Sequence, residues 1–364
     1  MKIVSTSKTK IFITNIFIYL CIILLFIKSE NVYTCVSNSL NIFLHTLVPS
    51  LYIYLFITEI LINTNLIYNL SFGISKILSK IFRIPKDATF IILISFLLGY
   101  PNSAKCIAKL YNDGKISLPL ARKLVSFTNN ASPSYILCAI GISMFNSLSI
   151  GIILLISHFL SSIIIGICYP YSQHIIQQNV SISNSFYKIS SPFDILLTST
   201  LNSFKTLGII LGYLIIFSLV PSILLNDLKA PNLIKSFLAG IFEITTGIQS
   251  VSILPLNTTT AILLTSFTLS FSSVMIIFQV YSFVYKIGIK LKELMFYKLL
   301  QGIISTIITY IILKLNIFKI ASNIPVSLNI SNFNVSPYLL PSLYAYIISS
   351  TIVILYLTLK KKRY

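Results

Sequence analysis

Two short polar segments interrupt apolar stretches and combine residue types that could bind an anion. The first, GYPNSAK, covers residues 99–105 and directly follows an apolar run. Its proline suits the first turn of a helix, and Asn102 and Ser103 can cap the free N–H groups of that turn. A helix N-terminus carries partial positive charge, to which Lys105 would add a full charge. The segment therefore predicts a site for an anion such as a carboxylate.

The second segment, FTNNASPS, covers residues 127–134. Ser132 is a natural N-cap, and Pro133 suits the first position of a short apolar helix that ends at residue 144. Asn129 and Asn130 add amide donors and acceptors. We expect the two helix N-termini to meet near the middle of a membrane. The alternatives are ordinary loops at the membrane surface and a Lys105 side chain that reaches the lipid headgroups.

Two acids lie in apolar sequence, although the whole chain has only eight Asp and Glu residues. Glu243 falls well inside the apolar stretch 232–254, where an acid costs about 2.5–3.5 kcal/mol on insertion scales. Glu59 is nearer the end of its stretch, so an interfacial position remains the alternative for it. Either acid is a candidate for coupling to a proton or a sodium ion, because burial disfavours the ionised carboxylate.

These considerations define a set of candidate residues. The predicted substrate-binding residues are Gly99, Tyr100, Pro101, Asn102, Ser103, Lys105, Asn129, Asn130, Ser132, Glu243, Thr245, Ser272, Ser273 and Gln279, and the predicted coupling residues are Glu59 and Glu243.

The composition places these residues in a membrane protein. Of 364 residues, 55% are hydrophobic and 10% are charged, and the formal net charge is +19. Most of the basic residues flank apolar stretches, which is typical of cytoplasmic loops and not of a nucleic-acid surface. We expect the N-terminus, the loop 63–87 and the C-terminus to lie on the cytoplasmic side. The expected partners are the lipid bilayer, a small anionic solute and, as an open alternative, a second copy of the chain.

Apolar stretches long enough to cross a bilayer predict an all-α polytopic protein. The expected spans are 11–27, 40–62, 147–168, 207–225, 232–254, about 299–313 and 336–359. The stretches 88–98, 134–144 and 255–269 are too short to cross and predict broken or re-entrant helices.

The chain also resembles itself. SFLLGYPN at 95–102 aligns with SFTLSFSS at 266–273, and each is followed by a glycine turn and preceded by an acid in an apolar stretch. We therefore predict one membrane domain, 1–364, with two structural repeats that carry broken or re-entrant hairpins. The first repeat is 40–169 with a gate hairpin, a polar linker is 170–192, the second repeat is 193–314, and a C-terminal span is 336–359. Interrupted segments at matching positions of two halves indicate a transporter binding site.

The sequence gives no indication of an enzyme. His45, His158 and His174 are scattered, and no HExxH, GxSxG or Walker A motif occurs. The five cysteines have no metal-ligand spacing. We expect no catalytic residue, no metal and no cofactor.

Five stretches, 49–61, 97–105, 115–145, 241–249 and 278–301, resemble the YlbJ family of sporulation integral membrane proteins. The resemblance covers nearly the whole chain. It implies gate modules similar to those of concentrative nucleoside transporters, and a role in moving dipicolinic acid across the outer forespore membrane. It also implies a glycine-rich second break, where this chain has Ser270-Phe271-Ser272-Ser273.

We therefore expect a sporulation membrane transporter for a small organic anion, with its site between broken helices at the midplane. The alternatives are a non-transporting scaffold or morphogenesis protein needed for the spore cortex, and a nucleoside transporter.

Overall fold

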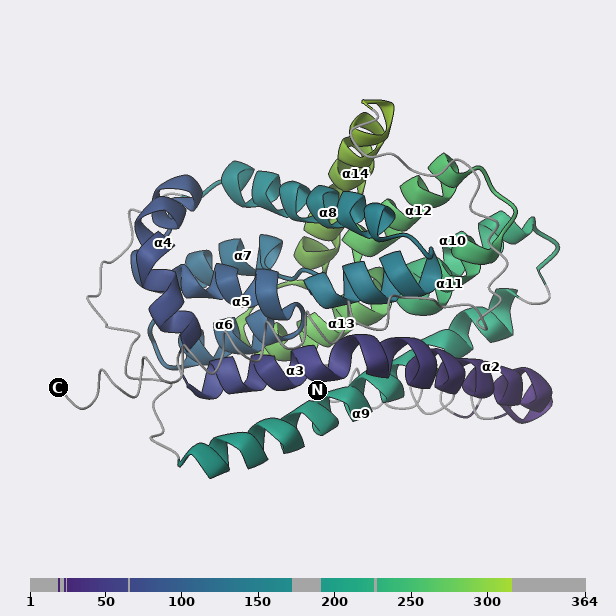
Figure 1. Ribbon diagram of the computed structural model, residues 1–364, viewed down its shortest axis with the longest axis horizontal. Coiled ribbons are helices and arrows are strands. Elements are labelled where there is room, and N and C mark those ends of the chain that lie inside the picture. Colours follow the sequence, from purple (N-terminus) through teal and green to yellow (C-terminus); the bar gives the residue numbers. More distant parts are fainter. Residues whose placement is uncertain are drawn as a thin grey trace, which may run out of the picture. The chain divides into compact units, whose positions relative to one another are not determined.

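The computed structural model describes residues 19, 23, 25–64, 66–171, 191–225 and 228–315. The predicted spans 11–27 and 336–359 and the linker 170–192 lie wholly or mostly outside these residues. Every regular element in the described part of the chain is a helix (Figure 1). The predicted all-α class is therefore confirmed.

The first part of the described chain contains α2 (Ser29–Ile42), η1 (Phe43–Leu47), α3 (Val48–Asn63), α4 (Leu66–Phe82), η2 (Lys86–Ala88), α5 (Phe90–Leu98), α6 (Asn102–Asn112), α7 (Leu118–Phe127), η3 (Tyr135–Met144) and α8 (Leu148–Cys168). The second part contains α9 (Pro192–Leu225), α10 (Asn232–Phe242), α11 (Ile244–Ile253), α12 (Thr258–Phe271), α13 (Ser273–Val284), η5 (Tyr285–Ile287) and α14 (Leu291–Lys314).

Helical segments long and apolar enough to cross a membrane recur along the described chain. The five are Ser29–Leu61, Leu148–Cys168, Pro192–Leu225, Thr258–Ile287 and Leu291–Lys314. They contain four of the predicted spans, those at 40–62, 147–168, 207–225 and 299–313. The first begins 11 residues earlier than predicted, because the polar segment α2 continues the same helix.

The first of these segments passes through a proline without ending. Pro49 has no N–H and its ring crowds the carbonyl four residues earlier, so a regular α-helix would be strained there. The turn Phe43–Leu47 is instead a π-helix, in which the N–H of Val48 donates to the oxygen of Phe43, five residues earlier. The wider turn accommodates the proline within a continuous helix.

The stretch 232–254 is not a span, and this part of the prediction is wrong. α10 ends at Phe242, Glu243 is extended (φ −138°, ψ 121°), and α11 starts at Ile244. The two helices fold back on each other as a hairpin whose closest approach is between Gly240 and Gly247: a Cβ at Gly247 would lie 2.0 Å from the Gly240 Cα. The break gives the Glu243 carboxylate two backbone N–H donors, which a continuous helix would not offer.

The predicted short stretch 255–269 is part of a longer broken helix. α12 continues to Phe271, and Ser272 (φ +71°) and Ser273 (φ +56°) are both left-handed. Such a conformation is uncommon outside glycine. Gly99, before α6, has φ +69°. α6 and α13 thus begin at positions paired in the sequence alignment. The two-repeat organisation stays a prediction, since α14 is unbroken where the first part of the chain breaks before η3.

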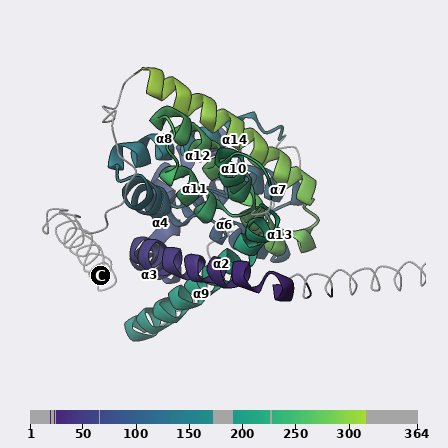
Figure 2. The same ribbon diagram turned by 90° about the vertical axis from the view of Figure 1, so that its right-hand side faces the viewer.

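The helices pack around two apolar clusters. One is built mainly from α5, α6, α7 and α13, and the other from η3, α8, α11 and α12. Tyr100 packs against both clusters. α2 and α3 run on into one another with α9 beside them (Figures 1 and 2). The first polar break therefore lies where the two clusters meet.

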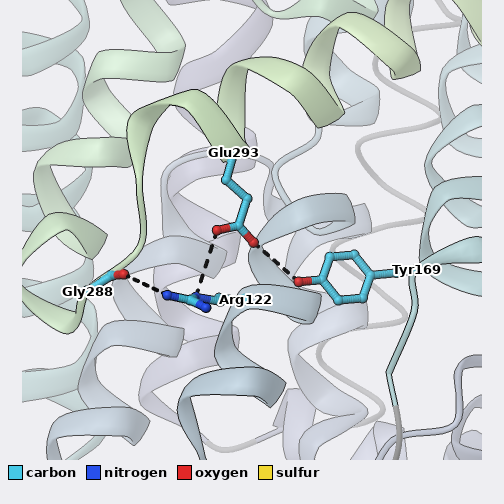
Figure 3. A network of polar contacts seen from close by, with 4 residues as sticks. All are labelled: Arg122, Tyr169, Gly288 and Glu293. Carbon is cyan, nitrogen blue, oxygen red and sulfur yellow. Dashed lines mark hydrogen bonds and ion pairs between the residues drawn. The ribbon is translucent and has the colours of Figure 1, made fainter.

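A polar contact network joins the middle of α7 to the start of α14, the turn before it and the residue after α8 (Figure 3). Arg122 of α7 donates from Nη2 to the oxygen of Gly288 at 3.2 Å, and its Nε lies 3.8 Å from Glu293 Oε2 at the start of α14. Tyr169, after α8, donates to Glu293 Oε1 at 3.2 Å. Because Gly288 has φ +86°, the turn before α14 places its carbonyl within reach of the guanidinium.

Replacing Arg122 with Gln should have a small effect. Its side chain is 36% exposed and that of Glu293 is 25% exposed, and pairs exposed to this degree contribute about 1 kcal/mol or less. We expect thermal unfolding of the purified protein in detergent to shift only slightly. Lys292→Gln, at an exposed position of α14, is the matched control. A drop as large as that of a core substitution would show that this network supports more than the helix ends.

Candidate functional site

The two predicted breaks touch each other inside the protein. The N–H of Tyr100 donates to the oxygen of Asn130 at 2.8 Å. A Cβ on Gly99 would lie 2.7 Å from the Ser132 nitrogen, so only glycine fits there. Backbone groups freed by one break are thus satisfied by the other, which is what an interior helix break in a membrane protein requires. We call this contact between residues 99–103 and 128–132 the junction.

Asn130 is the centre of the junction and is fully buried. Its Nδ2 donates to the Ser95 hydroxyl (2.9 Å), the Phe127 oxygen (2.9 Å) and the Ser162 hydroxyl (3.0 Å). Its Oδ1 accepts from Gln301 Nε2 at 3.0 Å. The amide has only two hydrogens, so the three acceptors share them. This side chain is committed to bonds within the protein and ties α5, α8 and α14 to the second break.

The predicted capping by Asn102 and Ser103 is wrong. Pro101 stands at the N-cap of α6, and no side chain caps that end. The Ser103 hydroxyl instead donates to the Thr128 oxygen and to Asn129 Oδ1 (3.2 Å), and Asn102 Nδ2 reaches back to the Leu98 oxygen at 3.5 Å. The Ser103 hydroxyl thus serves the contact with the second break, whereas Asn102 bonds to the preceding helix α5.

The prediction for Ser132 and Pro133 is confirmed. The helical turn starts at Pro133, and the Ser132 hydroxyl accepts the N–H of Tyr135 at 3.3 Å. The side chain of the same Tyr135 reaches α11, where its hydroxyl lies 3.2 Å from the Thr245 hydroxyl. The second break is therefore linked to the tip of the α10–α11 hairpin.

At that tip, the Glu243 carboxylate binds the N-terminus of α11. Oε1 accepts from the Thr245 N–H at 2.9 Å and Oε2 from the Thr246 N–H at 2.6 Å, and the residue is fully buried. The positive end of the helix dipole stabilises the carboxylate there. The N-terminus of α11 is thus an anion site that the Glu243 carboxylate of the same chain occupies.

Lys298 binds to the junction from α14, and the sequence did not indicate this contact. Its side chain, on α14, is 5% exposed. Nζ donates to the Asn129 oxygen and to Gln301 Oε1, the latter at 2.8 Å. Both acceptors are neutral. In the sequence, this lysine is one of the basic residues that precede a predicted span. Only its i, i+3 spacing to Gln301 suggests that the two side chains share a buried helix face.

His158 and Ser270 were also missed as members of the site. The His158 Nε2 lies 3.1 Å from the Ala131 nitrogen, and Nδ1 lies 2.9 Å from the Ser270 hydroxyl. A backbone N–H can only donate, so Nε2 accepts and the proton of the neutral ring sits on Nδ1. The ring therefore connects the second break to α12, a structural contact of the kind we expect for a lone histidine.

Five predicted site residues lie elsewhere, among them Ser272, whose hydroxyl donates to the Leu269 oxygen at 3.4 Å. Lys105 Nζ lies 5.3 Å from the ring centre of Phe283, near the end of α13, and within the described residues no hydrogen bond or ion pair joins it to the junction. Glu59 Oε2 accepts from Asn202 at 3.1 Å on the α3–α9 face. The hydroxyl of Ser273 is buried without a partner among the described residues, and Gln279 is 4% exposed on α13. Their predicted binding and coupling roles stay predictions.

The junction is closed in this structure. A cavity of about 10 Å³ lies beside Lys298 and Asn129, room for about one water molecule. Lys298, two helix N-termini and the asparagine amides are groups that can bind a carboxylate. They would have to part from one another first, as gates of secondary transporters do when they rock open.

Long apolar helices, an interior meeting of two helix breaks and a helical hairpin are features of a multi-pass α-helical integral membrane protein. Over 313 residues the chain is 25% identical to sporulation integral membrane protein YlbJ of Bacillus subtilis (strain 168), and the match covers 76% of each chain. It confirms the resemblance to the YlbJ family. No family model matches the chain, and no solved structure matches it. Similarity to concentrative nucleoside transporters stays a prediction.

Proposed function

We propose that this protein is a secondary transporter that moves a small organic anion, with dipicolinate as the first candidate, across the outer forespore membrane. The junction is the observation that carries the proposal. Helices that break inside the membrane are tolerated where they face protein or a wet cavity, and they build the substrate sites of secondary transporters. The sporulation setting comes from the name of the relative.

The proposed binding groups are those of the junction and of the hairpin tip. When the junction opens, Lys298 and the N-termini of α6 and η3 would face the solute, and each favours negative charge. Glu243 is the acid placed to carry a coupling proton. Protonation would weaken its two bonds to the start of α11, so the protonation state of Glu243 and the fold of the hairpin tip are linked.

The test is uptake of labelled dipicolinate into proteoliposomes that contain the purified full chain. We expect Lys298→Met to lower the initial uptake rate at least about tenfold, because it removes the cation of the junction. Lys292→Met, on an exposed position of the same helix, is the matched control and should keep the rate. Lys105→Met in the same assay tests whether that residue contributes.

Three results would contradict the proposal: no uptake above empty liposomes, full uptake by folded Lys298→Met, or an equal loss in the control. Size-exclusion chromatography of each variant separates loss of transport from loss of folding. Uptake that excess nucleoside abolishes would favour a nucleoside transporter instead.

A further inference from the structure

A large cavity with many polar lining residues lies apart from the junction, between α2, α9 and the α10–α11 hairpin. Its volume is about 620 Å³, within the range of small-molecule sites. Its lining residues are Glu30, Asn31, Thr34, Cys35, Asn38, Ser39, Asn41, Ile42, Ser218, Pro221, Ser222, Leu225, Lys235, Ser236, Ala239, Thr246, Gln249, Ser250 and Ile253. We call this cavity the lumen.

The lining follows one stripe on each helix. On α9 the residues are Ser218, Pro221, Ser222 and Leu225, and on α11 they are Thr246, Gln249, Ser250 and Ile253, which in each case are positions i, i+3, i+4 and i+7. Such spacing places side chains on one helical face. α2 and α9 belong to segments apolar enough to span a membrane, yet their hydroxyl and amide groups turn to one common space. Polar faces arranged in this way line water-filled paths and not lipid.

Unpartnered hydroxyls gather in the lumen wall. In the described chain, the buried side-chain atoms without a hydrogen-bond partner include the hydroxyl oxygens of Ser39, Ser218 and Thr246, and all three residues line the lumen. Ser39 is 1% exposed and Ser218 is 4% exposed. A buried hydroxyl without a partner costs free energy, so a small rotation that brings these groups to a polar solute in the lumen would be favourable.

We infer that the lumen is a second binding site, in which a small polar organic acid hydrogen-bonds to neutral side chains before it reaches the junction. This inference rests on the proposed transport function. Thr246 at the inner end belongs to the turn of α11 that already binds the Glu243 carboxylate, and Lys235 supplies a cation in the first turn of α10. The lumen wall also holds the acid Glu30, so we assign the carboxylate of the solute to the side of Lys235, and its remaining polar atoms meet hydroxyls and amides.

Cys35 gives the inference a direct test, because its thiol lines the lumen. The full chain is prepared in proteoliposomes with Cys35 as its only cysteine, and the modification rate by the water-soluble reagent 2-sulfonatoethyl methanethiosulfonate is measured. The matched control keeps only Cys106, which is buried in an apolar cluster. We expect Cys35 to react at least about tenfold faster than Cys106, because the lumen admits water. A rate for Cys35 no faster than that for Cys106 would overturn the inference.

Protection by solutes tests binding. Pyridine-2,6-dicarboxylate should slow the modification of Cys35, whereas pyridine-2,6-dimethanol, with the same ring and no carboxylate, should not. Absence of protection by the diacid, or equal protection by both compounds, would overturn the inference. Uptake without protection of Cys35 would refute the lumen site and leave the transport proposal standing. Protection without uptake would refute transport and leave the site.

Ser218→Ala, in the Cys35-only protein, probes the wall itself. The Ser218 hydroxyl has no partner in the described chain, so its removal should leave the unfolding temperature unchanged but raise the half-protecting diacid concentration about fivefold, the value of one lost hydrogen bond. Ser203→Ala is the matched control: Ser203 is also buried on α9, but it bonds to the Ser199 oxygen and does not line the lumen. Equal effects of the two substitutions would overturn the inference.

Discussion

Gly247→Ala should be the most damaging single-methyl change in the described chain. A Cβ at this position would lie 2.0 Å from the Gly240 Cα and 2.3 Å from its nitrogen. Both atoms belong to the backbone of the neighbouring helix, so no side-chain rotation relieves the clash and the hairpin must open. We expect a loss of about 3 kcal/mol or more in the free energy of unfolding. We expect this loss to appear as a marked fall in the unfolding temperature of the purified variant in detergent.

Gly208→Ala is the matched control for this prediction. Gly208 lies in α9, and no atom of the described residues lies within 4 Å of its added Cβ. Alanine is a better helix former than glycine by about 1 kcal/mol, so this variant should be at least as stable as the parent protein. Equal unfolding temperatures for the two variants would mean that α10 and α11 are not packed as described.

Asn130→Leu should be the second most damaging change. Leucine is close to asparagine in size, but it removes the bonds to Ser95, Ser162 and Gln301 and leaves their polar groups buried without that partner. Each such group costs about 1–3 kcal/mol. We expect a loss of at least about 3 kcal/mol in stability and, with it, loss of dipicolinate uptake.

Asn202→Leu separates this effect from the general cost of losing an asparagine. Asn202 is exposed on α9 and donates one bond, to Glu59, so its loss should cost about 1 kcal/mol or less. If both variants unfold at the same temperature, Asn130 does not hold the junction together. A stable Asn130→Leu protein without uptake would instead assign this side chain a direct role with the solute.

Local sequence signals predicted the breaks at the junction well. Glycine followed by proline in 99–101, and a serine before Pro133, restrict the backbone whatever surrounds them. Helical stretches too short to cross a membrane then had to meet inside the protein, and the bond from Tyr100 to Asn130 shows that they do. These features depend on a few neighbouring residues, which is why one sequence was enough.

The hairpin at Glu243 could not be predicted in this way. No proline or glycine stands at its turn, and the apolar character of 232–254 continues through it. The turn depends on the contact between Gly240 and Gly247 and on two N–H donors that exist only after the chain has turned. Lys298 was missed for a related reason, because a basic residue before a span has the same sequence pattern whether its side chain points to the headgroups or to the junction.

The lumen could not be predicted from the amino-acid composition of its helices. Ser29–Ile42 contains glutamate, serines and asparagines, which lower its hydropathy below that of an ordinary span. Its polar side chains are explained only once α9 and the hairpin are placed beside it. Tertiary packing decides which face of such a helix meets water, and a hydropathy window averages over both faces.

The carboxylate at the start of α11 sets a condition on any anion that enters from solution. Glu243 precedes the residues whose N–H groups it binds by only two and three positions, so its effective concentration there far exceeds that of a dissolved competitor. An external ion can take those groups only by exchange with this internal ligand. Under the proposed transport function, weakly accepting anions such as chloride would lose that competition, and the exchange would discriminate against them without a dedicated filter.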